Sequence, residues 1–115
     1  KLDFEDSGIT SMDERFLQNL FTILEKNYSY PQFNSNVFSK AAGLSMMQLH
    51  RKISALTRHS TGDFIRSYRL NVAAQMLRKE SGTVAEIAYD VGFNSPSYFT
   101  ECFRKQFGLR PSEFT

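Results

Sequence analysis

The chain has 115 residues, of which 41% are hydrophobic and eleven are phenylalanine, so the composition excludes a disordered protein and allows one domain with a modest core. No apolar run approaches the roughly 20 residues that span a bilayer, and the single cysteine, Cys102, excludes an internal disulfide bond. The net charge is only +2, but residues 46–115 carry ten basic and six acidic side chains, an excess that favours a polyanionic partner.

The spacing of apolar residues predicts helices along the whole chain. They recur at three- and four-residue steps, and no segment alternates convincingly, so the expected fold is all-α. The first helix is predicted to open at Ser11, because Ser11-Met12-Asp13-Glu14 has the form of a capping box. It should end near Tyr28, since Pro31 bars its continuation.

Five further helices follow from start and stop signals. The second begins at Asn34 or Ser35 and stops at Gly43. The third covers 45–58, and the fourth is long, from Ser60 or Thr61 to residue 80. Thr83-Val84-Ala85-Glu86 is a second capping box, which opens the fifth helix. This helix stops at Gly92. Ser95-Pro96 places a cap and a first-turn proline at the start of the sixth, which Gly108 ends, and a short turn follows at Pro111.

The chain also contains an internal repeat. Residues 37–45 align with residues 86–94 at an offset of 49, which superposes the turn glycines Gly43 and Gly92. From Leu49 onward the offset is 50, so the second turn holds one extra residue. A helix, a glycine turn and a second helix, present twice, is typical of two tandem helix-turn-helix units. Two ordinary helical hairpins in a bundle would give the same pattern.

These signals predict a domain organisation. Residues 1–10 are acidic and lack a period, and we expect them to be a linker to a missing upstream domain. Residues 11–115 form the domain. Within it we expect a first helix-turn-helix unit at about 34–58, a linker helix at about 61–80 and a second unit at about 83–107.

The second unit carries an extended sequence signature. The run Ile87-Ala88-Tyr89-Asp90-Val91-Gly92-Phe93-Asn94-Ser95-Pro96-Ser97-Tyr98-Phe99, with residues 103–105 and 108–114, closely resembles the signature of the AraC/XylS family of bacterial transcription regulators. The first unit is also similar to the family at residues 41–45, 49–52, 64–66 and 69–70. The resemblance covers roughly residues 12–115. It implies sequence-specific binding of double-stranded DNA, with no enzymatic activity and no cofactor.

Three positions depart from the family pattern. Arg58 stands where the family often has glycine after the third helix, and Thr61 replaces its usual proline. These two changes raise the question of how the third helix passes into the fourth. Glu101 stands where many members carry arginine in the last helix, which puts base reading by the second unit in question.

A recognition helix needs an apolar face toward its domain and a polar face toward the DNA groove. The helix at 45–58 has both, with Leu49, Ile53 and Leu56 on its apolar face. Its predicted DNA-binding residues are Met47, His50, Arg51, Ser54 and Arg58. In the last helix the predicted buried face consists of Phe99, Cys102, Phe103 and Phe107. The predicted DNA-binding residues there are Ser95, Ser97, Thr100, Glu101, Arg104 and Lys105.

The chemistry of the polar side chains suggests roles on the third helix. Arg51 can donate two parallel hydrogen bonds to guanine O6 and N7, or clamp a phosphate. His50 can bond to a base edge or stay in solvent. Met47 can contact a thymine methyl group or fill a gap in the core.

The last helix and the linker helix leave more alternatives open. Glu101 can accept from cytosine N4, or pair with Arg104 or Lys105. Those two cations otherwise suit phosphates, which position a protein without reading sequence. Ser97 and Thr100 are candidate phosphate or base donors. Cys102 is expected to be a buried, inert thiol. Arg66 and Arg69 are candidates for the DNA backbone, for ion pairs or for solvent.

Other classes of function find little support. His50, His59 and Cys102 lack carboxylates placed to complete a usual zinc site, and no phosphate loop or nucleophile elbow occurs. A module that binds only protein would show an exposed apolar face. An RNA-binding surface would need aromatic rings on a stacking platform, whereas the phenylalanines fall on predicted buried faces.

A narrower resemblance concerns Gln48-Leu49-His50-Arg51-Lys52, which is similar to the output domains of hybrid two-component regulators of gut Bacteroidetes. It implies a sensor or receiver upstream on the same polypeptide, with RNA polymerase as a further partner. It also implies a cytoplasmic domain on a full-length protein anchored in the inner membrane. No spare apolar stripe is evident, so we expect the isolated domain to be monomeric.

Overall fold

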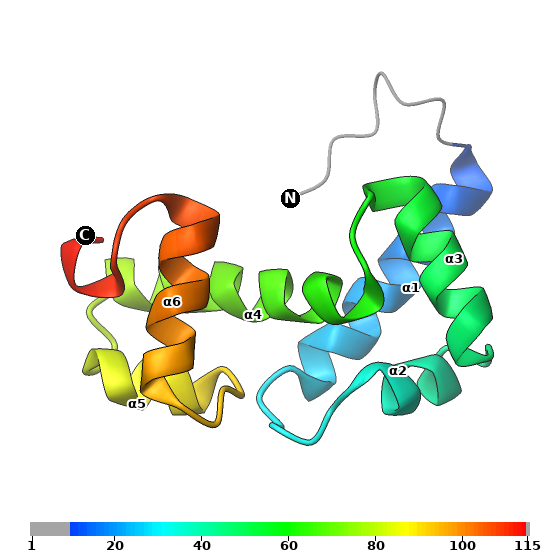
Figure 1. Cartoon of the computed structure of the whole chain (residues 1–115). Helices are drawn as coiled ribbons and strands as arrows, with labels where there is room; N and C mark the ends of the chain where they lie inside the picture. Colours follow the sequence, from blue (N-terminus) through cyan, green and yellow to red (C-terminus); the bar gives the residue numbers. More distant parts are fainter. Residues whose placement is uncertain (1–9, 115) are drawn as a thin grey trace.

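The computed structural model describes residues 10–114, which form helices and contain no strand, so the all-α prediction is confirmed. The elements are α1 (Ser11–Asn27), α2 (Ser35–Ala41), α3 (Met46–Thr57), α4 (Thr61–Arg78), α5 (Val84–Asp90), α6 (Pro96–Phe107) and the short 3-10 turn η1 (Pro111–Glu113). In Figure 1, α4 crosses the molecule, with α1, α2 and α3 at one end and α5 and α6 at the other. Residues 1–9 of the expected linker lie outside the described residues.

Helix α1 begins at the predicted residue but with a different cap. The Thr10 hydroxyl accepts a hydrogen bond from the Asp13 N–H at 3.2 Å, and the Asp13 carboxylate accepts one from the Thr10 N–H at 3.2 Å. The predicted capping box at Ser11 is therefore wrong by one residue. Thr10-x-x-Asp13 satisfies the same N-terminal donors, so Thr10 belongs to the helix as its cap.

The internal repeat is present in the structure. Helices α2 and α5 have seven residues each and begin 49 residues apart, whereas α3 and α6 have twelve each and begin 50 apart. At Gly43, with φ 73°, the N–H groups of Gly43 and Leu44 bond back to α2 carbonyls at 3.1 and 2.9 Å. Gly92, with φ 97°, and Phe93 close α5 by the same pair of bonds, both at 3.0 Å. Both units thus turn through a Schellman motif, in which the left-handed residue is a glycine.

Two hydrophobic cores lie at the two ends of α4. The first packs α1, α2 and α3 against the start of α4, and its buried residues are Leu17, Leu20, Leu24, Phe33, Phe38, Leu49, Ile53, Phe64 and Ile65. The second packs α5 and α6 against the remainder of α4, and its buried residues are Leu70, Ala73, Ala74, Leu77, Ile87, Ala88, Val91, Phe93, Phe99 and Phe103. Helix α4 is therefore a structural member of both units. No helix described between residues 10 and 114 has the length and apolar character needed to cross a membrane.

The ends of α3 and α4 show the local structure at Arg58 and Thr61, the two positions that depart from the expected family pattern. Arg58 itself adopts the left-handed conformation, with φ 65°, and ends α3 as Gly108, with φ 78°, ends α6. Thr61 is then the first residue of α4, a position that accepts proline as readily. Glu80, with φ 51°, also lies in the left-handed region, so α4 ends at Arg78 and not at residue 80.

Candidate nucleic-acid interface

A capping box and a buried face fix the orientation of α3. Ser45 and Gln48 exchange hydrogen bonds of 3.0 and 3.1 Å at its N-terminus. Leu49 and Ile53 are completely buried in the first core, and Leu56 is half-buried beside them. The opposite face of α3 is therefore directed away from the domain.

The predicted DNA-binding residues of α3 lie on that outer face. His50, Arg51 and Arg58 are exposed, and Met47 is 69% exposed, so Met47 does not fill a gap in the core. Ser54 is half-buried: its hydroxyl donates to the His59 carbonyl at 3.1 Å and lies 3.4 Å from His50 Nε2. Ser54 is thus already engaged within the protein.

Helix α6 presents a similar arrangement, with a serine cap and a buried face. Ser95 caps it by accepting from the Tyr98 N–H at 3.2 Å, so the Ser95 hydroxyl has a structural role. Phe99 and Phe103 are completely buried. Cys102 and Phe107, however, are only half-buried, which corrects the expectation of a fully buried thiol. Both side chains pack at the margin of the second core, where the apolar face of α6 meets solvent.

The exposed residues of α6 gather on one surface. Ser97, Glu101, Arg104 and Lys105 are exposed and Thr100 is half-buried. Glu101, Arg104 and Lys105 line a shallow hollow of about 490 Å³. Among residues 10–114 the one ion pair is elsewhere, so Glu101 does not form the alternative pair with its two cationic neighbours.

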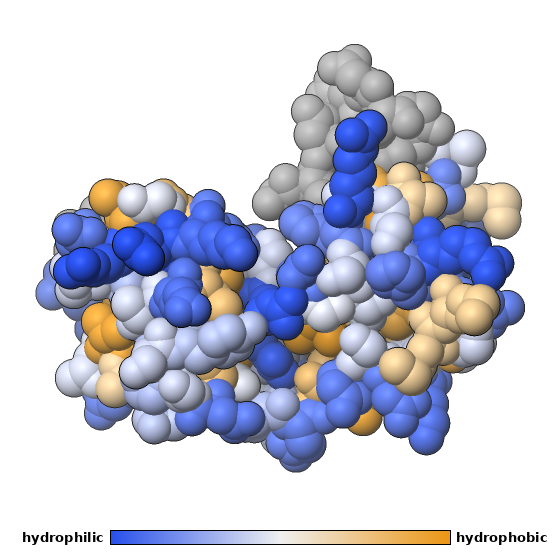
Figure 2. All heavy atoms as spheres, viewed as in Figure 1, coloured by the Kyte–Doolittle hydropathy of each residue, from blue (hydrophilic) through white to orange (hydrophobic). Residues whose placement is uncertain are grey.

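The face seen in Figure 2 is mostly hydrophilic. Strongly hydrophilic side chains gather over the upper part of α6 and beside α3, and a moderately hydrophobic patch lies at the N-terminal end of α3. Met46, 51% exposed, belongs to that end of α3, and Tyr98, 48% exposed, occupies the equivalent end of α6. The sequence analysis did not include Met46 or Tyr98 among the candidate DNA-binding residues. Tyr98 aligns with the capping residue Gln48 at an offset of 50, which would have placed it outside the core.

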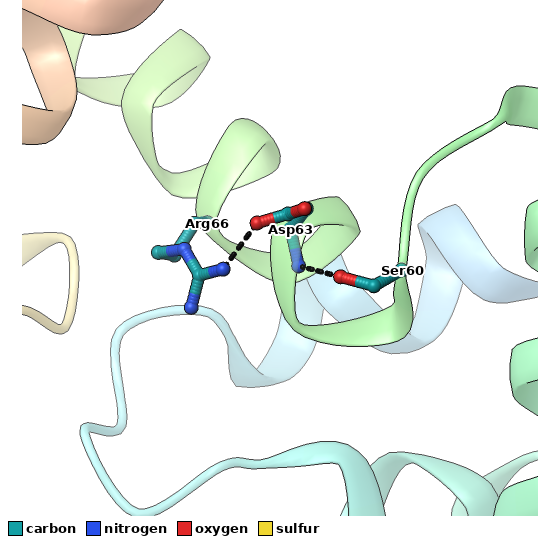
Figure 3. A network of polar contacts seen from close by, with 3 residues as sticks. All are labelled: Ser60, Asp63 and Arg66. Atoms are coloured by element: carbon teal, nitrogen blue, oxygen red, sulfur yellow. Dashed lines mark hydrogen bonds and ion pairs between the residues drawn. The ribbon is translucent and has the colours of Figure 1, made fainter.

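Two of the three arginines of α4, Arg66 and Arg69, have separate roles. Arg66 pairs with Asp63, whose N–H is in turn bonded to the Ser60 cap at 3.1 Å (Figure 3). The hydrogen bond from Arg66 lowers the pKa of Asp63. Arg69 is 8% exposed and donates to backbone carbonyls of the segment that joins α1 to α2. Arg69 is therefore neither ion-paired nor in solvent, and its side chain does not face the α3 or α6 surfaces.

The fold and its two exposed helical faces define a tandem helix-turn-helix protein, and three comparisons place it in a family. The family model described as "Helix-turn-helix domain" matches residues 38–115. Regulatory protein SoxS of Escherichia coli strain K12 is 33% identical over 88% of this chain and 94% of its own length. "Histidine kinase P4" of Formosa agariphila is 41% identical over 92% of this chain, which spans 8% of the kinase.

Two solved structures have a fold similar to that of this chain. An AraC-type transcriptional regulator from Chromobacterium violaceum superposes with a TM-score of 0.81 over 90% of this chain and 92% of that one, at 23% identity, which supports the fold. The C-terminal domain of the response regulator yesN from Fusobacterium nucleatum has a TM-score of 0.76 over 91% of this chain and 98% of that one, at 25% identity.

The chain belongs to the AraC-type family of helix-turn-helix DNA-binding domains. This family is non-catalytic, so the chain is a domain of a transcription regulator and not an enzyme. Two of these similar proteins, the histidine kinase and the response regulator yesN, are by name proteins of two-component signalling.

Proposed function

We propose that one copy of this domain reads two adjacent major-groove segments of double-stranded DNA, with α3 in the first and α6 in the second. The observation that carries the proposal is the equivalence of the two helices. Both have twelve residues, both bury two large side chains completely, and both turn their polar residues outward at opposite ends of α4 (Figure 1).

The dimensions of α4 suit this arrangement. Its 18 residues extend about 27 Å at 1.5 Å per residue, and one turn of B-DNA advances about 34 Å. The width of the units at either end makes up the difference. The two helices would then meet DNA on one face, about ten base pairs apart.

The two reading faces differ, so the bound site should be asymmetric. The α3 face offers His50 and Arg51 to base edges, with Met47 suited to a thymine methyl group and Arg58 to a phosphate. The α6 face offers Thr100 and Glu101 at the positions equivalent to His50 and Arg51. Ser97, Arg104 and Lys105 supply phosphate contacts, and Ser54 and Ser95 support the helices from within. We infer that the first block carries most of the base specificity.

Selection from random duplex DNA tests this function. The expected product is a non-palindromic site with two unlike blocks about ten base pairs apart, bound by one domain per duplex. Footprinting of the selected site should then show protection of both blocks. A single short block, or a palindrome bound by two domains, would contradict the proposal.

The relatives suggest how binding is controlled. In the Formosa agariphila histidine kinase the matched region is a small part of a much longer chain. We propose that this domain likewise serves as the output of a longer polypeptide, in which an upstream sensor or receiver module sets DNA occupancy. Contact with RNA polymerase and a monomeric state of the isolated domain belong to the same proposal.

The left-handed residue Arg58 allows stability and DNA contact to be separated. Arg58→Gly should raise the free energy of unfolding by about 0.5–1 kcal/mol, because glycine relieves the left-handed strain but adds chain entropy. It should also weaken DNA binding by removing a phosphate contact. Urea denaturation and fluorescence anisotropy measure the two effects.

Glu80→Gly is the matched control, since Glu80 has φ 51° and lies in the turn after α4. It should stabilise the domain to a similar extent and leave DNA affinity unweakened. Equal DNA affinity for the two variants would show that Arg58 does not touch DNA. A loss of stability in both would contradict the strain argument.

A further inference from the structure

Arg69 joins α4 to the first unit through main-chain atoms alone. Its Nε donates to the Tyr28 carbonyl at 2.9 Å, and one terminal nitrogen donates to the carbonyls of Tyr30 and Phe33 at 2.8 and 3.2 Å. Tyr28 is the C-terminal cap of α1, so the cation also lies at the negative end of that helix dipole. The guanidinium therefore fixes the segment between α1 and α2 against the middle of the linker helix.

Gly92, in the turn of the second unit, lies against the Tyr28 carbonyl and the Arg69 guanidinium. A Cβ atom at Gly92 would lie 2.3 Å from the Tyr28 carbonyl oxygen and 2.8 Å from Arg69 Nε, closer than real contacts allow. Gly43, the equivalent glycine of the first unit, has nothing within 4 Å of such an atom. The turn of the second unit is thus pressed against α1 and α4, whereas the turn of the first unit is open.

We propose that the contact among Tyr28, Arg69 and Gly92 sets the distance and rotation between the two reading helices, and thereby the spacing of the DNA blocks that the domain accepts. Arg69 is in this sense a positioning residue: it acts through the placement of α3 relative to α6 and touches no base. The inference rests on the proposed two-block function.

The contact is suited to this task because it crosses the boundary between the units. Helix α4 alone connects the two cores covalently, and a single helix can bend along its length. The contact adds a second point of attachment away from the α4 axis, which opposes bending and twisting. One base pair changes the separation of two blocks by about 3.4 Å and their relative rotation by about 35°. Two attached units should resist that change, and loosely joined units should accept it.

The test measures affinity for the selected site and for the same site with one base pair added or removed between the blocks. The wild-type domain should lose about tenfold or more in affinity for each altered spacing, comparable to the loss of one specific base contact. Arg69→Lys retains the charge but cannot span the three carbonyls, and Gly92→Ala retains the guanidinium but forces it away. For both variants the loss should fall to less than about threefold, because the freed units adjust to the altered spacing.

Gly43→Ala provides the matched control. It places the same side chain at a similar positive φ, 73° against 97°, but meets nothing. It should share the loss of stability and keep the wild-type spacing preference. Circular dichroism establishes which variants are folded at the temperature of the binding assay, and either folded junction variant suffices.

The outcomes separate the two proposals. A wild-type domain that is indifferent to spacing would overturn the two-block function itself. A wild-type domain that discriminates, with junction variants that discriminate equally, would overturn the positioning role alone. Unfolding of both junction variants while Gly43→Ala stays folded would show that the contact serves folding and would also overturn it.

Discussion

Inserting five base pairs between the two blocks of the selected site should abolish specific binding by a single domain. The insertion adds about 17 Å and rotates one block by about half a turn relative to the other. Helix α4 cannot follow a change of that size, since both of its halves are built into hydrophobic cores. Affinity should fall to the level of non-specific DNA, about 10³-fold or more below that of the intact site.

The measurement is a competition titration by anisotropy at fixed salt, because non-specific affinity depends strongly on ionic strength. A duplex with the same five base pairs inserted outside the blocks serves as the control and should bind normally. Undiminished affinity for the internal insertion would mean that only one unit reads DNA.

Arg51→Ala should cause the largest loss among single substitutions on the reading faces. Arg51 is exposed on α3, next to a face that is fixed by the completely buried Leu49 and Ile53, so its guanidinium extends from a rigid base. Loss of a bidentate contact to guanine should cost about 1–3 kcal/mol of binding free energy and relax the preference at one base pair. A panel of duplexes carrying each base at each position of the first block measures both effects.

Two controls separate base reading from charge. Arg51→Lys keeps the charge but loses the forked geometry, so it should recover part of the affinity without the base preference. Arg15→Ala removes an exposed cation from α1 and should leave the base preference unchanged. If Arg51→Ala weakens binding equally on all duplexes of the panel, Arg51 contacts a phosphate and reads no base.

Much of the fold could be predicted because its signals are local. The caps Ser45, Thr83 and Ser95 lie directly before the helices that they begin. The turn glycines Gly43 and Gly92 repeat at an offset of 49, and the helices that follow them begin 50 residues apart. Local signals also explain the error at α1. Thr10 and Ser11 both begin a plausible capping box, and only the backbone determines which of them is used.

The contact between the units could not be predicted in this way. Arg69 binds carbonyl groups that lie 36 to 41 residues earlier in the chain, and main-chain acceptors leave no mark in the side-chain pattern. The half-buried state of Cys102 was also hidden. Helical periodicity assigns a residue to a face, but the extent of burial depends on what the neighbouring elements cover.

The shared helix α4 also has a consequence for the folding of the chain. The part of α4 in either core is shorter than the roughly 12–15 residues that an isolated helix needs to persist in water, so it depends on packing at both ends. Unfolding of one core removes that support from the other, which makes denaturation in a single cooperative transition the expected behaviour. A fragment that holds only α2 and α3, or only α5 and α6, would lack the part of α4 against which its apolar side chains are buried. Each repeated segment has its own exposed polar face but is incomplete as a unit of folding.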